Sequence, residues 1–259
     1  MPEYLNELFN LKGKIALLTG AGGHIVSELS LGLARAGCIV AVGDIRLHKS
    51  QAVVEKITAE NGQAFPIEID VVQKDAWNNA VDGIVKDHGR IDILLNGAGI
   101  NAPTPFFDIS VEEWDQVLAT NLTGTLLGCQ VVGAHMAHHG RGSIINISSA
   151  SAGPPLSKAF AYSAAKAGVK NLTQNIAREL APKGVRVNSL RPGFFPTDWN
   201  LRNFITEERK TAILGHTPMG RFGDPSELVG AVLWLASDAA TFVTGAEISV
   251  DGGFLAMTI

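Results

Sequence analysis

Three polar residues in the second half of the chain have the types and spacing that proton transfer requires. Tyr162 and Lys166 are four residues apart in a stretch with helical periodicity, so both side chains fall on one face of the predicted helix. A phenol with a reference pKa near ~10 is protonated at neutral pH, and an adjacent cation favours its ionised form. Tyr162 can therefore exchange a proton with a substrate oxygen that Ser149 holds in place. Taken alone, a Tyr-x-x-x-Lys pair also fits an ordinary surface helix.

A glycine-rich turn near the start of the chain has the composition of a nucleotide-binding loop. The segment Gly20-Ala21-Gly22-Gly23 follows an apolar run and precedes a helical pattern, so backbone amides and a helix N-terminus can face an anion there. Asp44 ends the next apolar run, where a carboxylate can accept hydrogen bonds from an adenosine ribose or simply cap a helix. This carboxylate would repel a 2′-phosphate and favours NAD. Arg46 could pair with that phosphate, so NADP is not excluded.

Short apolar runs alternate with longer segments of helical periodicity along the whole chain. This alternation predicts parallel strands joined by helices, and nearly continuous apolar runs are typical of strands covered on both faces. No linker or repeat interrupts the pattern. We therefore predict an α/β fold: a single doubly wound Rossmann-type domain over residues 1–259, with a seven-stranded parallel sheet flanked by helices. The predicted strands are 15–19, 39–43, 64–69, 91–96, 143–148, 185–190 and 247–250, and the predicted helices are 26–36, 49–60, 73–87, 111–139, 159–180 and 225–236.

Composition and charge exclude several other classes of protein. The 259 residues are 46% hydrophobic and 18% charged, as in a globular protein rather than a disordered one. A net charge of -4 provides no basic surface for nucleic acid. No apolar run approaches the ~20 residues that span a bilayer, and no signal peptide is recognised, which predicts a cytoplasmic protein that does not engage a membrane. Cys38 and Cys129 are expected to be buried apolar residues rather than a disulfide.

The order of motifs around the tyrosine resembles the short-chain dehydrogenase/reductase family. Ser149 stands thirteen positions before Tyr162 (162 − 149), after an apolar strand pattern, and Lys166 follows four positions later. The similarity covers nearly the whole chain, from residue 14 to residue 253. It implies hydride transfer between a nicotinamide cofactor and a carbonyl or secondary alcohol. Tyr162 would be the general acid/base, Lys166 would lower its pKa and bind the nicotinamide ribose, and Ser149 would orient the substrate oxygen. Asn121 would complete the tetrad through a water-linked proton path.

The same resemblance implies a set of cofactor contacts and an oligomeric state. Asp70-Val71 matches the pair that contacts the adenine ring, and Asn96-Gly97-Ala98-Gly99 matches a segment that supports the sheet beside the cofactor. The segment from Pro192 to Thr197 matches the one that holds the nicotinamide carboxamide, and Val250-Asp251-Gly252-Gly253 matches the ending that forms a homotetramer interface. The implied cofactor residues are Gly20, Gly22, Gly23, His24, Ile25, Asp44, Ile45, Asp70, Val71, Asn96, Ala98, Gly99, Tyr162, Lys166, Pro192, Gly193, Phe195 and Thr197.

The glycine motif departs from the family pattern at two positions. The family's second and third glycines, which let the backbone approach the pyrophosphate and let helix and strand pack closely, are His24 and Val26 here. Gly22 and Gly23 can restore flexibility one or two residues earlier. His24 either donates to a phosphate or points to solvent while its amide binds.

Three histidines, His135, His138 and His139, gather at a predicted helix end. No acidic or thiol partner lies near them in the sequence. An exposed helix terminus explains them better than a metal site, so no metal is predicted.

The stretch 197–220 follows the nicotinamide segment, where the family carries a substrate lid. The chain there mixes aromatic and polar residues, including Trp199 and Phe204, which fits a partly polar substrate. Arg191 or Arg202 could pair with a carboxylate, or could serve core packing and surface solvation instead. Apolar residues that could wall the pocket are Phe194, Phe195, Trp199 and the Pro154-Pro155-Leu156 loop.

Several substrate classes remain compatible with the sequence. The segments 192–195 and 213–223 resemble family members that act on sugar acids, such as D-mannonate oxidoreductase, which makes a sugar acid or polyol the leading small-molecule substrate. Reduction of small ketones is an alternative. A cofactor-binding protein with little turnover is a third reading, which the altered glycine motif favours and the complete set of catalytic residues opposes.

Overall fold

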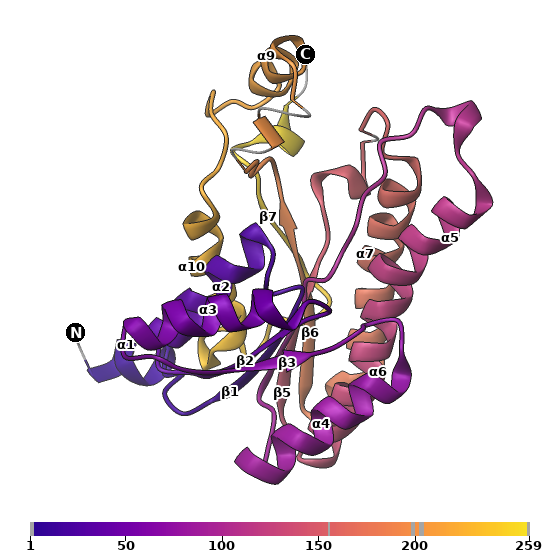
Figure 1. The fold of residues 1–259 in the computed structure, drawn as a ribbon. Helices are drawn as coiled ribbons and strands as arrows, with labels where there is room; N and C mark the ends of the chain where they lie inside the picture. Colours follow the sequence, from indigo (N-terminus) through magenta and orange to yellow (C-terminus); the bar gives the residue numbers. More distant parts are fainter. Residues whose placement is uncertain (1–2, 155, 198–199, 202–204, 258–259) are drawn as a thin grey trace.

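The computed structural model describes residues 3–154, 156–197, 200–201 and 205–257. Seven strands form one sheet: β1 (Ile15–Thr19), β2 (Ile39–Asp44), β3 (Gln63–Glu68), β4 (Ile93–Asn96), β5 (Gly142–Ile147), β6 (Val185–Pro192) and β7 (Glu247–Val250). Their order across the sheet is β3-β2-β1-β4-β5-β6-β7, and every neighbouring pair is parallel. The predicted seven-stranded parallel sheet is confirmed (Figure 1).

Helices cover both faces of this sheet (Figure 1), so the five central strands are buried, whereas the edge strands β3 and β7 are partly exposed. Successive strand residues alternate between two core clusters: Leu18 and Val40 belong to one, and Leu17 and Ala41 to the other. One layer holds α2 (His24–Arg35), α3 (Leu47–Ala59) and α10 (Val229–Ala236), and the opposite layer holds α4 (Lys74–His88), α5 (Val111–Leu118), α6 (Gly124–His138) and α7 (Phe160–Leu180). Two further helices, α1 (Glu3–Leu8) and α9 (Glu207–Gly215), lie outside these layers.

The predicted helix 111–139 is wrong in one respect, because a π-helical turn at Ala119–Thr123 separates α5 from α6. The apolar periodicity of the sequence cannot distinguish a single wide turn from the surrounding α-helix. The predicted helix 225–236 likewise begins with a 3₁₀ turn, Pro225–Leu228. Strand β6 runs two residues further than predicted, to Pro192.

The continuous helical stretch Val111–His138 is long and apolar enough, by length and composition, to cross a membrane. An uninterrupted apolar run of the ~20 residues that span a bilayer is not predicted from the sequence. In the structure 44% of its most apolar window is buried, and α6 packs against α4, α7, β4 and β5. Packing within the fold therefore accounts for its apolar composition.

The parallel arrangement brings the carboxyl ends of the strands to one edge of the sheet. The glycine turn follows β1, Asp44 ends β2, Asn96 ends β4, and Ser149 lies two residues beyond β5. Open α/β sheets bind their ligands at this edge. Residues that are far apart in the sequence are therefore assembled there.

Candidate active site

Tyr162, Lys166 and Ser149 meet at this edge, as the spacing predicted. Helix α7 presents the tyrosine and the lysine one turn apart, and the lysine Nζ lies 5.6 Å from the centroid of the tyrosine ring. Lys166 Nζ also donates a 2.8 Å hydrogen bond to the Ile147 carbonyl at the end of β5. All three side chains belong to residues that line one cavity of about 880 Å³. The lysine is thereby anchored to the end of β5, two residues before the serine.

Burial dominates the ionisation of the tyrosine and the lysine. Desolvation raises the pKa of Tyr162 above its ordinary value, and the hydrogen bond with Ser149 opposes that rise. Desolvation lowers the pKa of Lys166 to about 8, so the ammonium form still predominates at pH 7. Lys166 is not a source of the shift at Tyr162 in this structure, so its predicted influence on the phenol stays a prediction.

Asn121 is fully buried and sits in the π-helical turn between α5 and α6. Its Nδ2 donates to the carbonyls of Ile100, at 2.8 Å, and Val117, at 2.9 Å. Its Oδ1 has no hydrogen-bond partner among the described residues. A Cβ on Gly99 would lie 2.5 Å from this Oδ1 and 3.8 Å from Lys166 Nζ. Gly99 therefore leaves room for the Asn121 amide on the side of the lysine, and Asn121 lies in a π-helical turn, a feature that is frequent at functional sites.

A second cavity of about 480 Å³ adjoins the first, and residues such as Gly99, Ile100 and Phe195 line both. Gly193, Tyr162 and Lys166 line the larger cavity only. The smaller cavity is a groove that contains most of the predicted cofactor residues: Gly20, Gly23, His24, Ile25, Asp44, Ile45, Asp70, Val71, Ala98, Gly99, Phe195 and Thr197.

Gly22, Asn96 and Pro192 do not line either cavity, although they were predicted to contact the cofactor. The Gly22 amide donates to Asp44 Oδ2 at 3.1 Å, and Asn96 Nδ2 donates to Asn146 Oδ1 at 2.8 Å, which joins β4 to β5. Pro192 is buried at the end of β6. Motif matching cannot separate residues that face a ligand from residues that hold the ones that do.

The groove has the donors and the space that a dinucleotide requires. Gly20 has a φ of +68°, and a Cβ there would lie 2.6 Å from Ala98 Cα, so only glycine fits this turn. Gly23 is the N-cap of α2 and provides no side-chain bond to the first helical turn. The first amides of α2 can therefore bind a pyrophosphate. His24 is exposed at the rim of the groove.

The valine in the altered glycine motif is accommodated by a glycine on another strand loop. Val26 is 5% exposed, and a Cβ on Gly97 would lie 2.6 Å from its Cγ2. In the family pattern the residue at position 26 is a glycine, which has no side chain. Here the residue without a side chain is Gly97, and the Val26 side chain occupies the space beside it. Helix α2 can therefore pack closely against the loop after β4, because the valine side chain is on the helix and the loop residue opposite it is a glycine.

Asp44 is 5% exposed and lines the groove. Its Oδ1 accepts from the Arg46 amide at 3.0 Å and lies 3.4 Å from Arg46 Nε, while its Oδ2 accepts from Gly22. Arg46 is thus paired with the carboxylate in this structure.

The charged residues that line the larger cavity differ from the two arginines that the sequence suggested as partners of a carboxylate. Arg191 is 7% exposed and does not line the cavity, so its guanidinium serves internal packing instead of a substrate carboxylate. Lys158 and Arg209 do line it, and sequence reasoning missed both. Arg209 lies inside the predicted lid, which was a usable signal. The notable feature of Lys158, a left-handed φ of +55°, exists only in the structure. Pro155, Trp199, Arg202 and Phe204 lie outside the described residues.

Comparison with known proteins identifies the family. Residues 20–255 match a family model described as enoyl-(acyl carrier protein) reductase. The chain belongs to the short-chain dehydrogenase/reductase family. It is 38% identical to the 5-keto-D-gluconate 5-reductase of Escherichia coli strain K12, over 97% of this chain and 99% of that protein. The family-model match begins directly after β1 and includes the other six strands and the residues that line both cavities.

Solved structures of family members agree with this assignment. A gluconate 5-dehydrogenase from Burkholderia cenocepacia in complex with NADP and tartrate has a TM-score of 0.93 and 33% identity, covering 98% of this chain and 100% of that one. A candidate D-mannonate oxidoreductase from Haemophilus influenza with bound NAD has a TM-score of 0.90 and 35% identity, covering 96% and 97%. This dehydrogenase/reductase is accordingly an oxidoreductase that transfers a hydride between a nicotinamide cofactor and a carbonyl or secondary alcohol.

Proposed function

We propose that Tyr162, Lys166, Ser149 and Asn121 perform the proton chemistry of this hydride transfer. The observation that carries the proposal is the convergence of these four residues, of which Asn121, Ser149 and Lys166 are buried, on the cavity that adjoins the groove. The nicotinamide, when bound, supplies or accepts the hydride. Ser149 holds the substrate oxygen by a hydrogen bond, and Tyr162 donates a proton to that oxygen during reduction or removes it during oxidation. Lys166, held by the Ile147 carbonyl, favours the ionised phenol.

The test compares the two tyrosines of the chain. Tyr162→Phe removes the proton donor, so kcat should fall by at least ~100-fold while the NAD dissociation constant stays within twofold. Tyr4 is 69% exposed in α1, and Tyr4→Phe is the matched control that should leave kcat unchanged. Near-normal turnover of Tyr162→Phe would refute the assignment. Tight NAD binding by the unmodified protein without dehydrogenase activity on a broad panel of alcohols would instead favour the reading of this chain as a cofactor-binding protein.

We infer NAD as the preferred cofactor. The buried Asp44 carboxylate at the adenosine end suits a ribose with free hydroxyls and opposes a 2′-phosphate, and the ion pair with Arg46 engages the cation that could favour NADP. Calorimetric titration should show tighter binding of NAD than of NADP, and Asp44→Asn should reduce that preference at least tenfold. Equal affinities in the unmodified protein would contradict the inference.

We propose a sugar acid as the substrate. Lys158 and Arg209 line the cavity together with Lys166, and its described lining contains no aspartate or glutamate. Arg209 is placed by the first turn of α9, where Thr206 accepts a hydrogen bond from its amide. Lys158 holds a left-handed backbone that costs a non-glycine residue about 1–2 kcal/mol, and such strain often marks functional positions. The names of the relatives, 5-keto-D-gluconate 5-reductase and gluconate 5-dehydrogenase, favour the same class.

Rates on charged and neutral substrates test this assignment. Lys158→Met and Arg209→Met should each lower kcat/KM for 5-ketogluconate or fructuronate by roughly tenfold or more, because a charge-assisted bond to the carboxylate is lost. Turnover of a neutral polyol should change less than twofold. Lys183→Met, on an exposed turn outside both cavities, is the control. Activity confined to bulky apolar ketones, or equal losses on neutral and charged substrates, would overturn the proposal.

We further propose a cytoplasmic homotetramer, one catalytic domain per chain, with residues 197–220 as the substrate lid. Cys38 and Cys129 are free and buried, which fits a reducing compartment. The tetramer rests on the family resemblance of the Val250–Gly253 ending. Light scattering after gel filtration should give four times the 27.4 kDa chain mass, and a monomer would contradict it.

A further inference from the structure

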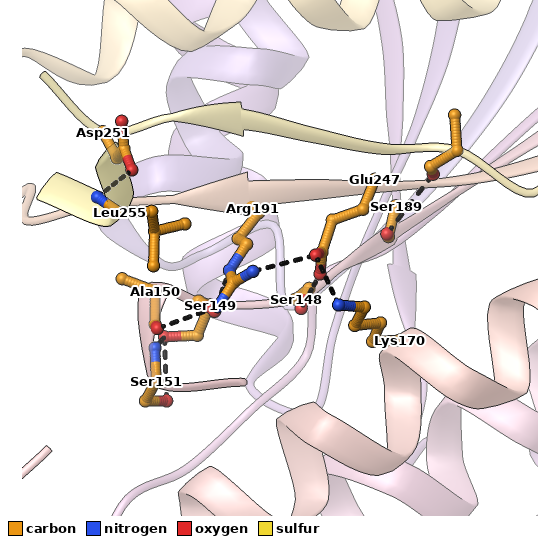
Figure 2. A network of polar contacts seen from close by, with 11 residues as sticks. Ser148, Ser149, Ala150, Ser151, Lys170, Ser189, Arg191, Glu247, Asp251 and Leu255 are labelled. Atoms are coloured by element: carbon orange, nitrogen blue, oxygen red, sulfur yellow. Dashed lines mark hydrogen bonds and ion pairs between the residues drawn. The ribbon is translucent and has the colours of Figure 1, made fainter. Parts of the chain in front are cut away.

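Arg191 belongs to β6, and its guanidinium lies next to Ser149 and Ala150 (Figure 2). Its Nε donates to the Ser149 carbonyl at 3.0 Å, and its Nη2 donates to the Ala150 carbonyl at 3.2 Å. Its Nη1 donates to Glu247 Oε2 at 2.9 Å. All three nitrogens of this buried guanidinium therefore donate hydrogen bonds. Two of these bonds go to the backbone carbonyls of Ser149 and of the residue that follows it.

Glu247 completes the arrangement from β7 (Figure 2). Its Oε2 accepts from Arg191 and lies 3.4 Å from Lys170 Nζ on α7. Its Oε1 accepts a 3.1 Å hydrogen bond from the Ser148 hydroxyl. The carboxylate thus orients the guanidinium and holds the residue before Ser149 as well.

The backbone carbonyls of Ser149 and Ala150 lie beyond the end of β5, so no strand pairing provides hydrogen-bond donors to them. Strand β5 ends at Ile147, and the Ser148 amide donates to the Leu190 carbonyl at 2.8 Å. Strand β6 ends at Pro192, which has no N–H to donate. The guanidinium fork provides donors to the two following carbonyls in place of backbone amides.

The loop beyond the serine is shaped around the same group. A Cβ on Gly153 would lie 2.5 Å from Arg191 Nη2, so the glycine makes room for the guanidinium. On the other side of the backbone, Ser149 Oγ accepts from the amide of Ser151 at 3.2 Å and faces the substrate cavity. Arg191 thus holds the Ser149 carbonyl, while the Ser149 hydroxyl faces the cavity.

We propose that Arg191, oriented by Glu247, is a positioning residue that aims the Ser149 hydroxyl at the substrate oxygen. It acts through Ser149 and touches neither cavity. The inference rests on the role of Ser149 in the proposed function. Lysine cannot replace the arginine, because a single ammonium cannot span two carbonyls and a carboxylate in this planar arrangement.

A double-mutant cycle tests the inference. Arg191→Met should lower kcat by roughly tenfold or more, because misplacing the serine degrades transition-state geometry. In the Ser149→Ala background the same change should cost less than twofold, because the group through which it acts is absent. The NAD dissociation constant should stay within twofold in all four proteins. A purely structural role would instead give the same loss in both backgrounds.

Two further variants separate positioning from stability. Arg186 is on the same strand, is partly buried and donates to the Ser237 carbonyl, far from Ser149. Arg186→Met should therefore destabilise the fold while kcat stays within twofold of the original value. If Arg191→Met does not fold, Arg191→Lys enters the same cycle and should show the same dependence on Ser149.

The outcomes are distinguishable. Equal losses in both backgrounds, or normal kcat in the arginine variant beside an impaired Ser149→Ala, would overturn this inference and leave the proposed function standing. Normal turnover of Ser149→Ala would instead remove the proposed role of the serine and, with it, the basis of the inference.

Discussion

A methyl group added at Gly97 should test how this protein tolerates a valine in its glycine motif. The new Cβ of Gly97→Ala would lie 2.6 Å from Val26 Cγ2, 3.0 Å from the Thr19 carbonyl oxygen and 3.1 Å from Leu95 Cδ2. A helical valine has one strongly preferred χ1 rotamer, and the carbonyl belongs to the backbone of β1, so neither can move away easily. Overpacking of this kind costs about 1–3 kcal/mol.

The same geometry predicts a compensating change. Val26→Ala alone removes two buried methyl groups and should cost roughly 1.5 kcal/mol or more. In the double variant the methyl at position 97 occupies the space that the valine vacates. The double variant should therefore be more stable than the sum of the single effects by at least ~1 kcal/mol.

Urea and thermal unfolding provide the measurement. For a chain of this size 1 kcal/mol corresponds to roughly 2–4 °C in Tm, so Gly97→Ala should lower Tm by several degrees. Gly83 is exposed in α4 with no atom within 4 Å of the Cβ position, and Gly83→Ala is the matched control, expected to be neutral or stabilising. Strict additivity of the Gly97 and Val26 effects, or a Gly97→Ala protein as stable as the original, would refute the reasoning.

Two other predictions concern Lys166 and Asn121, two buried residues of the proposed active site. Because burial lowers the pKa of Lys166 from 10.5 to about 8, the folded state binds fewer protons than the unfolded state between those pH values. Below pH 8, Lys166→Met should therefore be more stable than the original protein by roughly 3 kcal/mol. The difference should shrink towards pH 10.5, because the original protein gains stability across this window. Urea titrations at several pH values measure this, and a difference that does not change with pH contradicts it. Gly99→Ala would place a methyl group 2.5 Å from Asn121 Oδ1, and the Asn121 amide cannot easily move away because its Nδ2 donates to two carbonyls. We expect kcat to fall roughly tenfold because the asparagine is displaced. An unchanged kcat would count against a role for Asn121.

Local pattern in the sequence was enough to predict the sheet and to select the residues proposed for proton transfer. Apolar runs covered on both faces are visible in the sequence because burial demands them, so the seven strands were predicted within a few residues of their observed ends. Tyr162 and Lys166 share a helical face by spacing alone, and a motif match added Ser149 and Asn121. The structure brings these four residues together as that pattern predicted.

Only the tertiary structure decided which residues face the ligand and which support it. Arg191 and Arg202 were equal candidates for a substrate carboxylate; Arg191 is now seen to bond to Ser149, Ala150 and Glu247, while Lys158 and Arg209 line the cavity. The space for Val26 is likewise provided by Gly97, seventy-one positions away (97 − 26). Periodicity and motif spacing report only on neighbours along the chain. These contacts arise from strand order and from packing between distant segments, which no local pattern contains.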